Sequence, residues 1–488
     1  QAQAAALATK WAAAGNAALQ SARDRRLHTF LMRHLPTISQ LLSERRLARA
    51  GTTLFTESRG AQDSKAVLTA SFFKLVAPAL LTGRRVVALS FMPLALDDVP
   101  ARYILIAYSA PEGSSSGEAL PAGLLLLWDL EAPSNPVQAM VCQGEVTCVQ
   151  WLSAERQLIL AGLEEGGLCL WDLREPQTAH AHLAPEPHGP ALRLRHPTYT
   201  TEWAAPDLPL DASDLAVVDI AVEHARSGEH EHASPACLSL DRGGGVSAWA
   251  LAELSRNVVA QQDQDLGLRV GSRVKLMPLS RELPCGPRRR GEIGAASTIE
   301  LVPSDTNQFV VATDTAGVIR GARFGNPSAP RAFTLASFAR SVAAAAAVAI
   351  AFGPRKTQTE ADAEAMSETG ELFAVGYSSG TVALYETGSS RPVHVWFVDS
   401  RVGGLAFSPA HADHLFVLDD ISTVRVLQTA PPYKVVHSER FGGTGDDGIP
   451  KVVKFAVSDA AADPGIAFAY ADGRVDVHSL RASLPNRA

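Results

Sequence analysis

The chain has 488 residues, of which 46% are apolar, and this length suffices for one large domain with a small extension. A net charge of −7 provides no basic field, so we expect no nucleic acid partner. The longest apolar run, 341–352, is too short to span a bilayer, and no secretion signal opens the chain, so we expect no membrane insertion.

Residues 1–50 are rich in Ala, Leu, Gln, Arg and Lys, and they predict a helical extension with a kink or new start at Pro36. Because the chain begins with Gln1, we expect that an N-terminal portion is missing. Apolar residues at helical spacing form a stripe that either packs on the rest of the chain or docks another subunit. The stripe consists of Leu27, Phe30, Leu31, Leu35, Ile38, Leu41 and Leu42. Residues 51–64 are expected to be a linker.

A short pattern then recurs through the rest of the chain: a turn residue is followed five positions later by a closing residue, usually aromatic. Apolar residues stand two and four positions after the turn, which is typical of a half-buried strand entered from a tight hairpin. Two copies close with Trp-Asp, at Asp129 and Asp172. The copies are Gly123 with Trp128, Gly166 with Trp171, Gly244 with Trp249, Gly317 with Ala322, Gly380 with Tyr385, Ser422 with Leu427, and Gly473 with His478.

Further short apolar runs precede the closing strands, three before Trp171 and two before Tyr385 and Leu427, and four short strands repeated around an axis predict a β-propeller. We expect an all-β fold with seven blades of the WD-repeat type over residues 65–482, followed by a tail at 483–488. Six or eight blades remain possible because the faint copies are easy to miscount. Insertions at 175–215, 276–298 and 354–370 are rich in Pro, Gly, His and charge, and they predict surface loops.

The Trp-Asp pairs have a structural interpretation. We expect Trp171 to pack between neighbouring blades and Asp172 to accept nearby donors, rather than to face a ligand. Arg174 and Glu175 leave the strand into a loop, where they are candidates for partner contact or simply solvated.

Chemical motifs are weak, and we expect neither a catalytic site nor a bound cofactor or metal. The run 376–380 matches the nucleophile elbow around Ser378, but a strand follows it where the elbow requires a helix. His224, His230, His232 and Cys237 fit no closed zinc spacing and indicate a polar loop. Five cysteines without CxxC spacing favour a reducing cytosolic compartment, with Cys148 and Cys169 as buried thiols.

The chain resembles the dynein intermediate chains over nearly its whole length. The resemblance rests on "LHTFLMRHLPTISQLLSE" ahead of the repeats, on "VPSDTNQFVVATDTAGVIRGARFG" at 302–325, and on the order of "LLLLWDLEAPSNP", "VTCVQWL", "GLCLWDLREP" and "DLGLRVGSRVKL". Departures occur at Ala322, Leu427 and His478, which replace the closing Trp, and at Ala250, which replaces the Asp. They put the usual hydrogen-bond network of those blades in doubt.

This resemblance implies a non-catalytic motor subunit at work in retrograde intraflagellar transport. Its partners would be a dynein heavy chain, a second intermediate chain, dynein light chains and the intraflagellar transport train. It would act in the cytoplasm and the cilium, associated with the cytoskeleton. The alternative is a generic WD-repeat adaptor, such as a ubiquitin ligase substrate receptor, which has no reason to carry the helix or the family-like blade.

Overall fold

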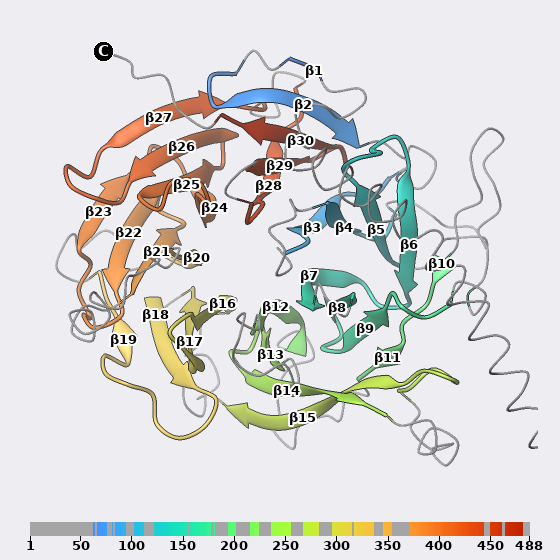
Figure 1. Cartoon of the computed structure of the whole chain (residues 1–488). Coiled ribbons are helices and arrows are strands. Elements are labelled where there is room, and N and C mark those ends of the chain that lie inside the picture. The colour runs from blue at the N-terminus through green and yellow to red at the C-terminus, as the bar shows by residue number, and fades with distance from the viewer. Residues whose placement is uncertain are drawn as a thin grey trace, which may run out of the picture. The chain divides into compact units, whose positions relative to one another are not determined.

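The structure is a computed structural model in which the strands of the described residues form seven sheets arranged in a ring (Figure 1). The described residues contain almost no helix. The seven-bladed propeller predicted from the repeats is therefore confirmed. The helical extension at 1–50 lies outside the described residues, which are 62–63, 66–75, 81, 83–93, 102–111, 122–153, 157–176, 180, 194–201, 215–223, 236–254, 267–282, 295–314, 317–335, 345–353, 371–443, 449–460 and 464–481.

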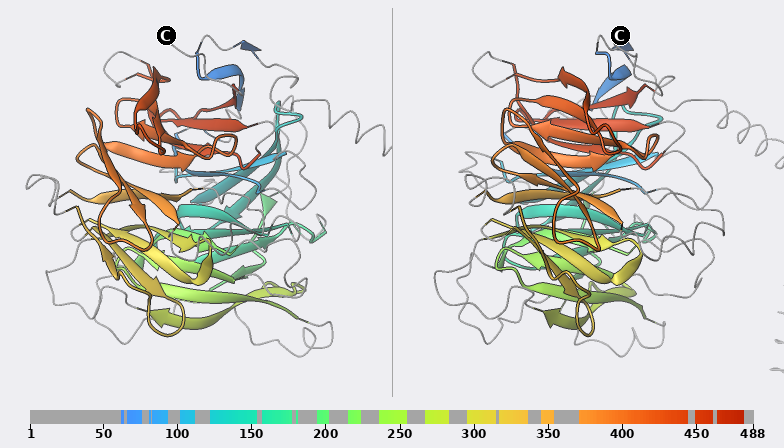
Figure 2. Two further views of the ribbon diagram at one scale, coloured as in Figure 1. Left: turned by 60° about the vertical axis from the view of Figure 1, so that its left-hand side comes forward. Right: turned by 90° about the vertical axis from the view of Figure 1, so that its left-hand side faces the viewer.

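Each blade is a meander whose first strand lies nearest the axis of the ring, and Figure 2 shows the same ring from the side. Blade 1 contains β3 (Val86–Phe91), β4 (Tyr103–Tyr108), β5 (Gly123–Asp129) and β6 (Pro136–Cys142). Blade 2 contains β7 (Val146–Ser153), β8 (Leu158–Leu163), β9 (Leu168–Asp172) and β11 (Tyr199–Thr200). Blade 3 contains β12 (Val217–Val222), β13 (Ala236–Asp241), β14 (Val246–Glu253) and β15 (Val274–Glu282).

Blades 4 to 6 repeat the same order. Blade 4 contains β16 (Ala296–Val302), β17 (Asp305–Thr313), β18 (Gly317–Ala322) and β19 (Ala332–Phe333). Blade 5 contains β20 (Ala347–Phe352), β21 (Leu372–Tyr377), β22 (Thr381–Glu386) and β23 (His394–Phe397). Blade 6 contains β24 (Val402–Phe407), β25 (His414–Asp419), β26 (Thr423–Gln428) and β27 (Val435–Arg440).

Blade 7 joins the two ends of the propeller sequence. Its inner strands are β28 (Val452–Val457), β29 (Gly465–Tyr470) and β30 (Val475–Leu480), and its fourth strand is β2 (Thr69–Leu75) from the other end. A fifth strand, β1 (Gln62–Asp63), pairs antiparallel with β2 and falls in the segment 51–64 expected to be a linker. The ring is thus closed by hydrogen bonds between residues about 400 positions apart in the chain, as between Thr69 and Arg481.

The repeated turn residue has a conformational reason. Where the second strand of a blade turns into the third, five of the predicted glycines have a positive φ: Gly166, Gly244, Gly317, Gly380 and Gly473. Glycine adopts this left-handed region without strain, which explains its recurrence there. Ser422, the predicted substitute in blade 6, has the same conformation with φ of 64°.

The closing strands differ from the prediction in two respects. Each is the third strand of its blade rather than the last, because the next run along the chain adds the outer strand. Most of these strands are also buried on both faces and not half-buried, and every residue of β5, β9 and β30 is buried. The strand β14 is the exception, because buried and partly exposed residues are mixed along it. Burial on both faces arises because each sheet packs between two others, so that seven apolar clusters lie between successive blades.

Two predicted surface loops contain strands. The insertion at 175–215 supplies β11 and also β10 (Leu194–Arg195), which pairs parallel with β6 as a fifth strand of blade 1. The predicted insertion at 276–298 overlaps β15, the outer strand of blade 3. These corrections have a common cause: outer strands pack on one side only, so their sequences are polar and look like loops.

Candidate interaction site

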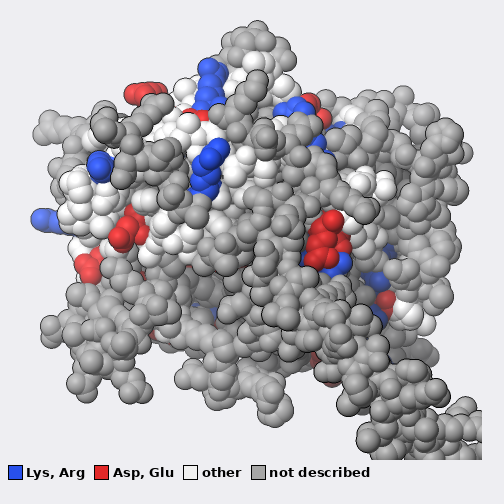
Figure 3. Space-filling model, turned by 45° about the horizontal axis from the view of Figure 1, so that its top comes forward, with Lys and Arg blue, Asp and Glu red and all other residues white. Residues whose placement is uncertain are grey.

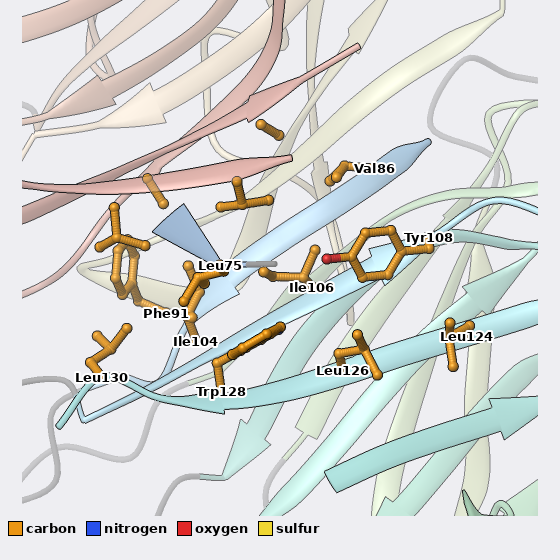
Figure 4. Close-up of a cluster of buried hydrophobic side chains, with 14 of the residues drawn as sticks. Leu75, Val86, Phe91, Ile104, Ile106, Tyr108, Leu124, Leu126, Trp128 and Leu130 are labelled. Carbon is orange, nitrogen blue, oxygen red and sulfur yellow. The ribbon is translucent and has the colours of Figure 1, made fainter. Parts of the chain in front are cut away.

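The two Trp-Asp pairs make structural contacts inside the propeller. Trp128 and Trp171 are fully buried, and each faces the blade before its own. Figure 4 shows Trp128 with Tyr108 among the aliphatic side chains between blades 7 and 1. The carboxylate of Asp129 accepts the backbone N–H of Glu131 at 3.0 Å and is paired with Arg102. These positions serve packing and turn formation.

Asp172 has the same role in blade 2 and holds one of the candidate partner-binding residues. Its carboxylate accepts the backbone N–H of Arg174 at 2.9 Å, and Arg174 Nη2 donates to it at 2.8 Å. The Arg174 side chain is nevertheless 41% exposed and extends toward Glu253 of blade 3, with Nη2 3.4 Å from the carboxylate. A solvent-facing guanidinium held by its neighbours remains available to a partner.

Glu175 is placed differently, because its carboxylate is bound within the chain. Ser272 Oγ donates to it at 2.7 Å, and Arg269 donates to its other oxygen. The His180 Nε2 atom lies 3.6 Å from the same carboxylate, and only 12% of the Glu175 side chain is exposed. Glu175 therefore links the segment after β9 to the segment that leads into β15. Of Arg174 and Glu175, Arg174 is the better candidate for partner contact.

The other closing positions are occupied by side chains that satisfy the same packing need. Trp249 Nε1 donates to Ser239 Oγ at 2.9 Å, so its indole N–H is satisfied within blade 3. Leu427 is fully buried. In blade 4 the closing residue is the small Ala322. The residue before it, Gly321, has no side chain, and this leaves room for the ring of Phe309. A Cβ at Gly321 would lie 2.3 Å from that ring. Tyr385 is also fully buried, and its hydroxyl oxygen lies 3.2 Å from that of Tyr377 on the neighbouring strand, within hydrogen-bond distance.

Carboxylates at the hairpin turns are functional parts of the fold that the sequence analysis missed. Asp241 accepts the backbone N–H of Gly245 at 2.6 Å, and Asp419 accepts that of Thr423 at 2.8 Å. Each is also paired with an arginine, Arg281 or Arg425 respectively. The available signal was an Asp three residues before the turn residue, Gly244 or Ser422.

Ser378 lies in a strand–turn–strand segment between β21 and β22, as expected from its sequence context. Its hydroxyl accepts the backbone N–H of Ala346 at 3.0 Å, and its own N–H donates back to the Ala346 carbonyl. The hydroxyl therefore ties a hairpin to the segment that leads into blade 5, which is a structural use.

The candidate cysteines that the structure describes are packing residues. Cys148 and Cys169 are buried thiols, as expected, and burial raises the pKa of Cys148 to about 12. Burial likewise raises the pKa of Cys237, in β13, to about 12. His224, His230 and His232 lie outside the described residues. Among the described residues, no group of three or more His, Cys, Asp and Glu side chains could hold a metal ion.

The predicted docking stripe, Leu27 to Leu42, lies outside the described residues and stays a prediction. On the face shown in Figure 3, described basic and acidic side chains are interspersed, with no field of one sign. In the described part of the chain, no helix is long and apolar enough to cross a membrane.

The fold and its repeated turn and closing positions define a β-propeller of the WD-repeat type. No family model matches the chain. It is 26% identical over 429 residues to cytoplasmic dynein 2 intermediate chain 1 of Mus musculus, covering 82% of this chain and 40% of that protein. The Homo sapiens protein of the same name is 26% identical to this chain over 327 residues, and the match covers 62% of this chain and 29% of the human protein. The curated homologues of this chain are thus dynein intermediate chains, as the sequence resemblance predicted, and the chain spans less than half of their length.

Proposed function

We propose that this chain is a non-catalytic intermediate chain of the cytoplasmic dynein-2 complex. The observation that carries the proposal is the match to a dynein-2 intermediate chain over 82% of the chain, together with the seven-bladed propeller of the structure. A propeller offers broad, rigid faces and variable loops, which suit a subunit that holds others in place.

In this proposal the propeller binds the tail of the dynein-2 heavy chain. The N-terminal region, with the stripe from Leu27 to Leu42, binds dynein light chains. Further partners are the second dynein-2 intermediate chain and the intraflagellar transport train. The chain then supports retrograde intraflagellar transport and cilium assembly, in the cytoplasm and at the cilium.

The direct experiment is to purify the intact chain from ciliated cells and to identify the subunits that accompany it. Recovery of the dynein-2 heavy chain and light chains in constant proportion supports the proposal. Recovery of ubiquitin ligase subunits without any dynein subunit would replace it with the generic adaptor.

The stripe has its own test. Changing Phe30 and Leu31 together to Asp places two charges in an apolar contact, so we expect the light chains to be released while the propeller keeps its melting transition. If every subunit is retained but the chain melts earlier, the stripe only packs on the rest of the chain.

A further inference from the structure

The outer strand of blade 7 is attached to its sheet differently from the outer strands of blades 1 and 6. In those two blades a short turn joins the third strand to the outer strand, at 130–135 and at 429–434. In blade 7 the third strand, β30, and the outer strand, β2, belong to opposite ends of the propeller sequence, although they lie side by side (Figure 1). Because no hairpin ties β2 to β30, non-covalent contacts alone keep β2 in the ring.

The pairing of β2 with β30 is interrupted near the point where the chain enters β2. Thr69 lies opposite Leu480, and the register shifts before the next pair, which begins at Phe72. The regular part of the ladder therefore covers four residues of β2, from Phe72 to Leu75. On its other side β2 pairs with the two residues of β1. At its N-terminal end, β2 thus depends on contacts other than the ladder.

Four hydrogen bonds hold the chain at this end. Glu439 Oε1 accepts the backbone N–H of Val67 at 2.7 Å, and its Oε2 accepts that of Leu68 at 2.8 Å. Arg481, directly after β30, donates its backbone N–H to the Leu68 carbonyl and its Nε–H to the Thr69 carbonyl, both at 3.1 Å. These four contacts to residues 67–69 are called the latch below. Two of them come from blade 6, so the latch ties β2 to a blade to which it does not belong.

The latch lies in a partly dry environment. The side chain of Leu68 is buried among apolar side chains of blades 6 and 7. The side chain of Glu439 is 18% exposed, and His437 Nε2 lies 3.3 Å from its carboxylate. A carboxylate that is shielded from water forms stronger hydrogen bonds to backbone N–H groups than a solvated one does. Loss of the Glu439 charge should therefore weaken the latch measurably.

Removal of β2 would uncover surface that is now buried. Every residue of β30 is buried while β2 is in place, and without β2 it would become an edge strand with unpaired backbone groups. Phe73 and Leu75 of β2 are also buried, in the cluster between blades 7 and 1. A state in which β2 has left the ring is therefore less stable than the closed ring and is sparsely populated.

We propose that β2 is a releasable strap: it leaves blade 7 as a unit while the other blades stay folded, and the latch sets how often it does so. Local openings of this kind have a lower free energy than global unfolding, because most of the packed core stays intact. The inference goes beyond the proposed function, since it concerns the chain alone. Because β2 follows the N-terminal region directly, a protein that binds this region more tightly in one of the two states shifts the equilibrium between them.

Hydrogen exchange of the full chain under native conditions, followed by mass spectrometry at several low urea concentrations, measures this opening. In the wild type, we expect the amides of β2 to exchange faster than those of β9, in which every residue is buried. The exchange of β2 should depend only weakly on urea, because its opening exposes little surface. Glu439→Gln, which loses the charge and one of the two hydrogen bonds, should speed the exchange of β2 about tenfold.

Val375→Ala is the matched control. Val375 is fully buried in β21 of blade 5, so this substitution also lowers the global stability, but it leaves the contacts of β2 intact. It should speed the exchange of β9 and leave that of β2 unchanged. If β2 of the wild type exchanges only together with β9, the strap does not open separately. If Val375→Ala speeds the exchange of β2 as much as Glu439→Gln does, the latch does not control it. Either result overturns the inference and leaves the proposed function, which the purification tests, untouched.

Discussion

The carboxylate of Glu439 accepts the backbone N–H of Leu68 at 2.8 Å, although the two residues lie 371 positions apart in the chain. Its other oxygen accepts the N–H of Val67 at 2.7 Å. Glu439 belongs to β27 of blade 6, whereas Leu68 leads into β2 of blade 7 and is itself buried between those two blades. One side chain therefore fixes the chain at the point where the ring closes.

Replacing this carboxylate should loosen the closure. Glu439→Gln keeps one acceptor oxygen but loses the charge and one of the two hydrogen bonds, so we expect the free energy of unfolding to fall by about 1–2 kcal/mol. Urea unfolding at neutral pH measures the change. Glu282→Gln, at the exposed end of β15, is the control and should change stability by less than about 0.5 kcal/mol. Equal effects of the two substitutions would contradict a role for Glu439 in closure.

The closing strand pair also contains a histidine that should make the propeller sensitive to acid. His478 is stacked on Phe72 with ring centroids 5.1 Å apart, and burial lowers its pKa to about 3. The unfolded chain binds this proton near pH 6.5, whereas the folded chain does not, so stability is lost as pH falls below about 6.5. The loss is about 2 kcal/mol between pH 6.5 and 5.

His478→Phe removes the titrating group and keeps a ring among Phe72, Phe441 and Phe468. We expect its melting temperature to fall less than that of the wild type between pH 7 and pH 5. Burial also lowers the pKa of His180 to about 4, and part of the acid sensitivity should therefore remain in the variant. An identical pH dependence in both proteins would show that His478 is accessible to protons in the folded state.

The packing of the blades gives the largest expected effect. Trp171 is fully buried between blades 1 and 2, and Trp171→Ala should lower the free energy of unfolding of the propeller by about 3–5 kcal/mol. Trp11, in the predicted helical extension, should contribute almost nothing to the propeller. Calorimetry of both variants tests this boundary, which is contradicted if the two substitutions lower the melting temperature alike.

The sequence predicted the blade count because its signal is conformational and repeated. A residue at positive φ, usually a glycine such as Gly166 or Gly380, stands where the second and third strands of a blade meet at a tight turn. The outer strands carried no comparable signal. The strand β15 was taken partly as an insertion, since a strand that packs on one side tolerates polar residues and a proline, Pro278.

The internal networks were not predictable for a different reason. Glu175 meets Arg269 and Ser272 across about 95 residues of sequence, and nothing in the local pattern around Glu175 indicates that its carboxylate is bound. The sequence correctly placed Glu175 in a loop after a strand. Whether its side chain is solvated, however, depends on which distant segments fold back over that loop.

Ser422 provides a case in which the repeat pattern and the structure predict opposite results. Glycine occupies this turn in five other blades, and Ser422 has φ of 64°, where a side chain costs about 1–2 kcal/mol. On the repeat pattern alone, Ser422→Gly should stabilise the chain. Yet Ser422 Oγ accepts the backbone N–H of Val452 at 2.9 Å and donates to the carbonyl of Gly443 at 2.9 Å, both in a buried setting.

The hydrogen bonds should decide the sign. Removing the hydroxyl leaves two buried backbone groups without this partner, at about 1–3 kcal/mol each, which exceeds the relief of strain. We therefore expect Ser422→Gly to lower the free energy of unfolding by about 1–3 kcal/mol. Gln157→Gly is the matched control, because Gln157 also has a positive φ, of 52°, but its side chain is exposed. The free energy of unfolding of this variant should stay unchanged or rise by up to about 1 kcal/mol. Denaturant unfolding of the two variants separates the effects, and a stabilised Ser422→Gly would mean that backbone strain outweighs the hydroxyl at the junction of blades 6 and 7.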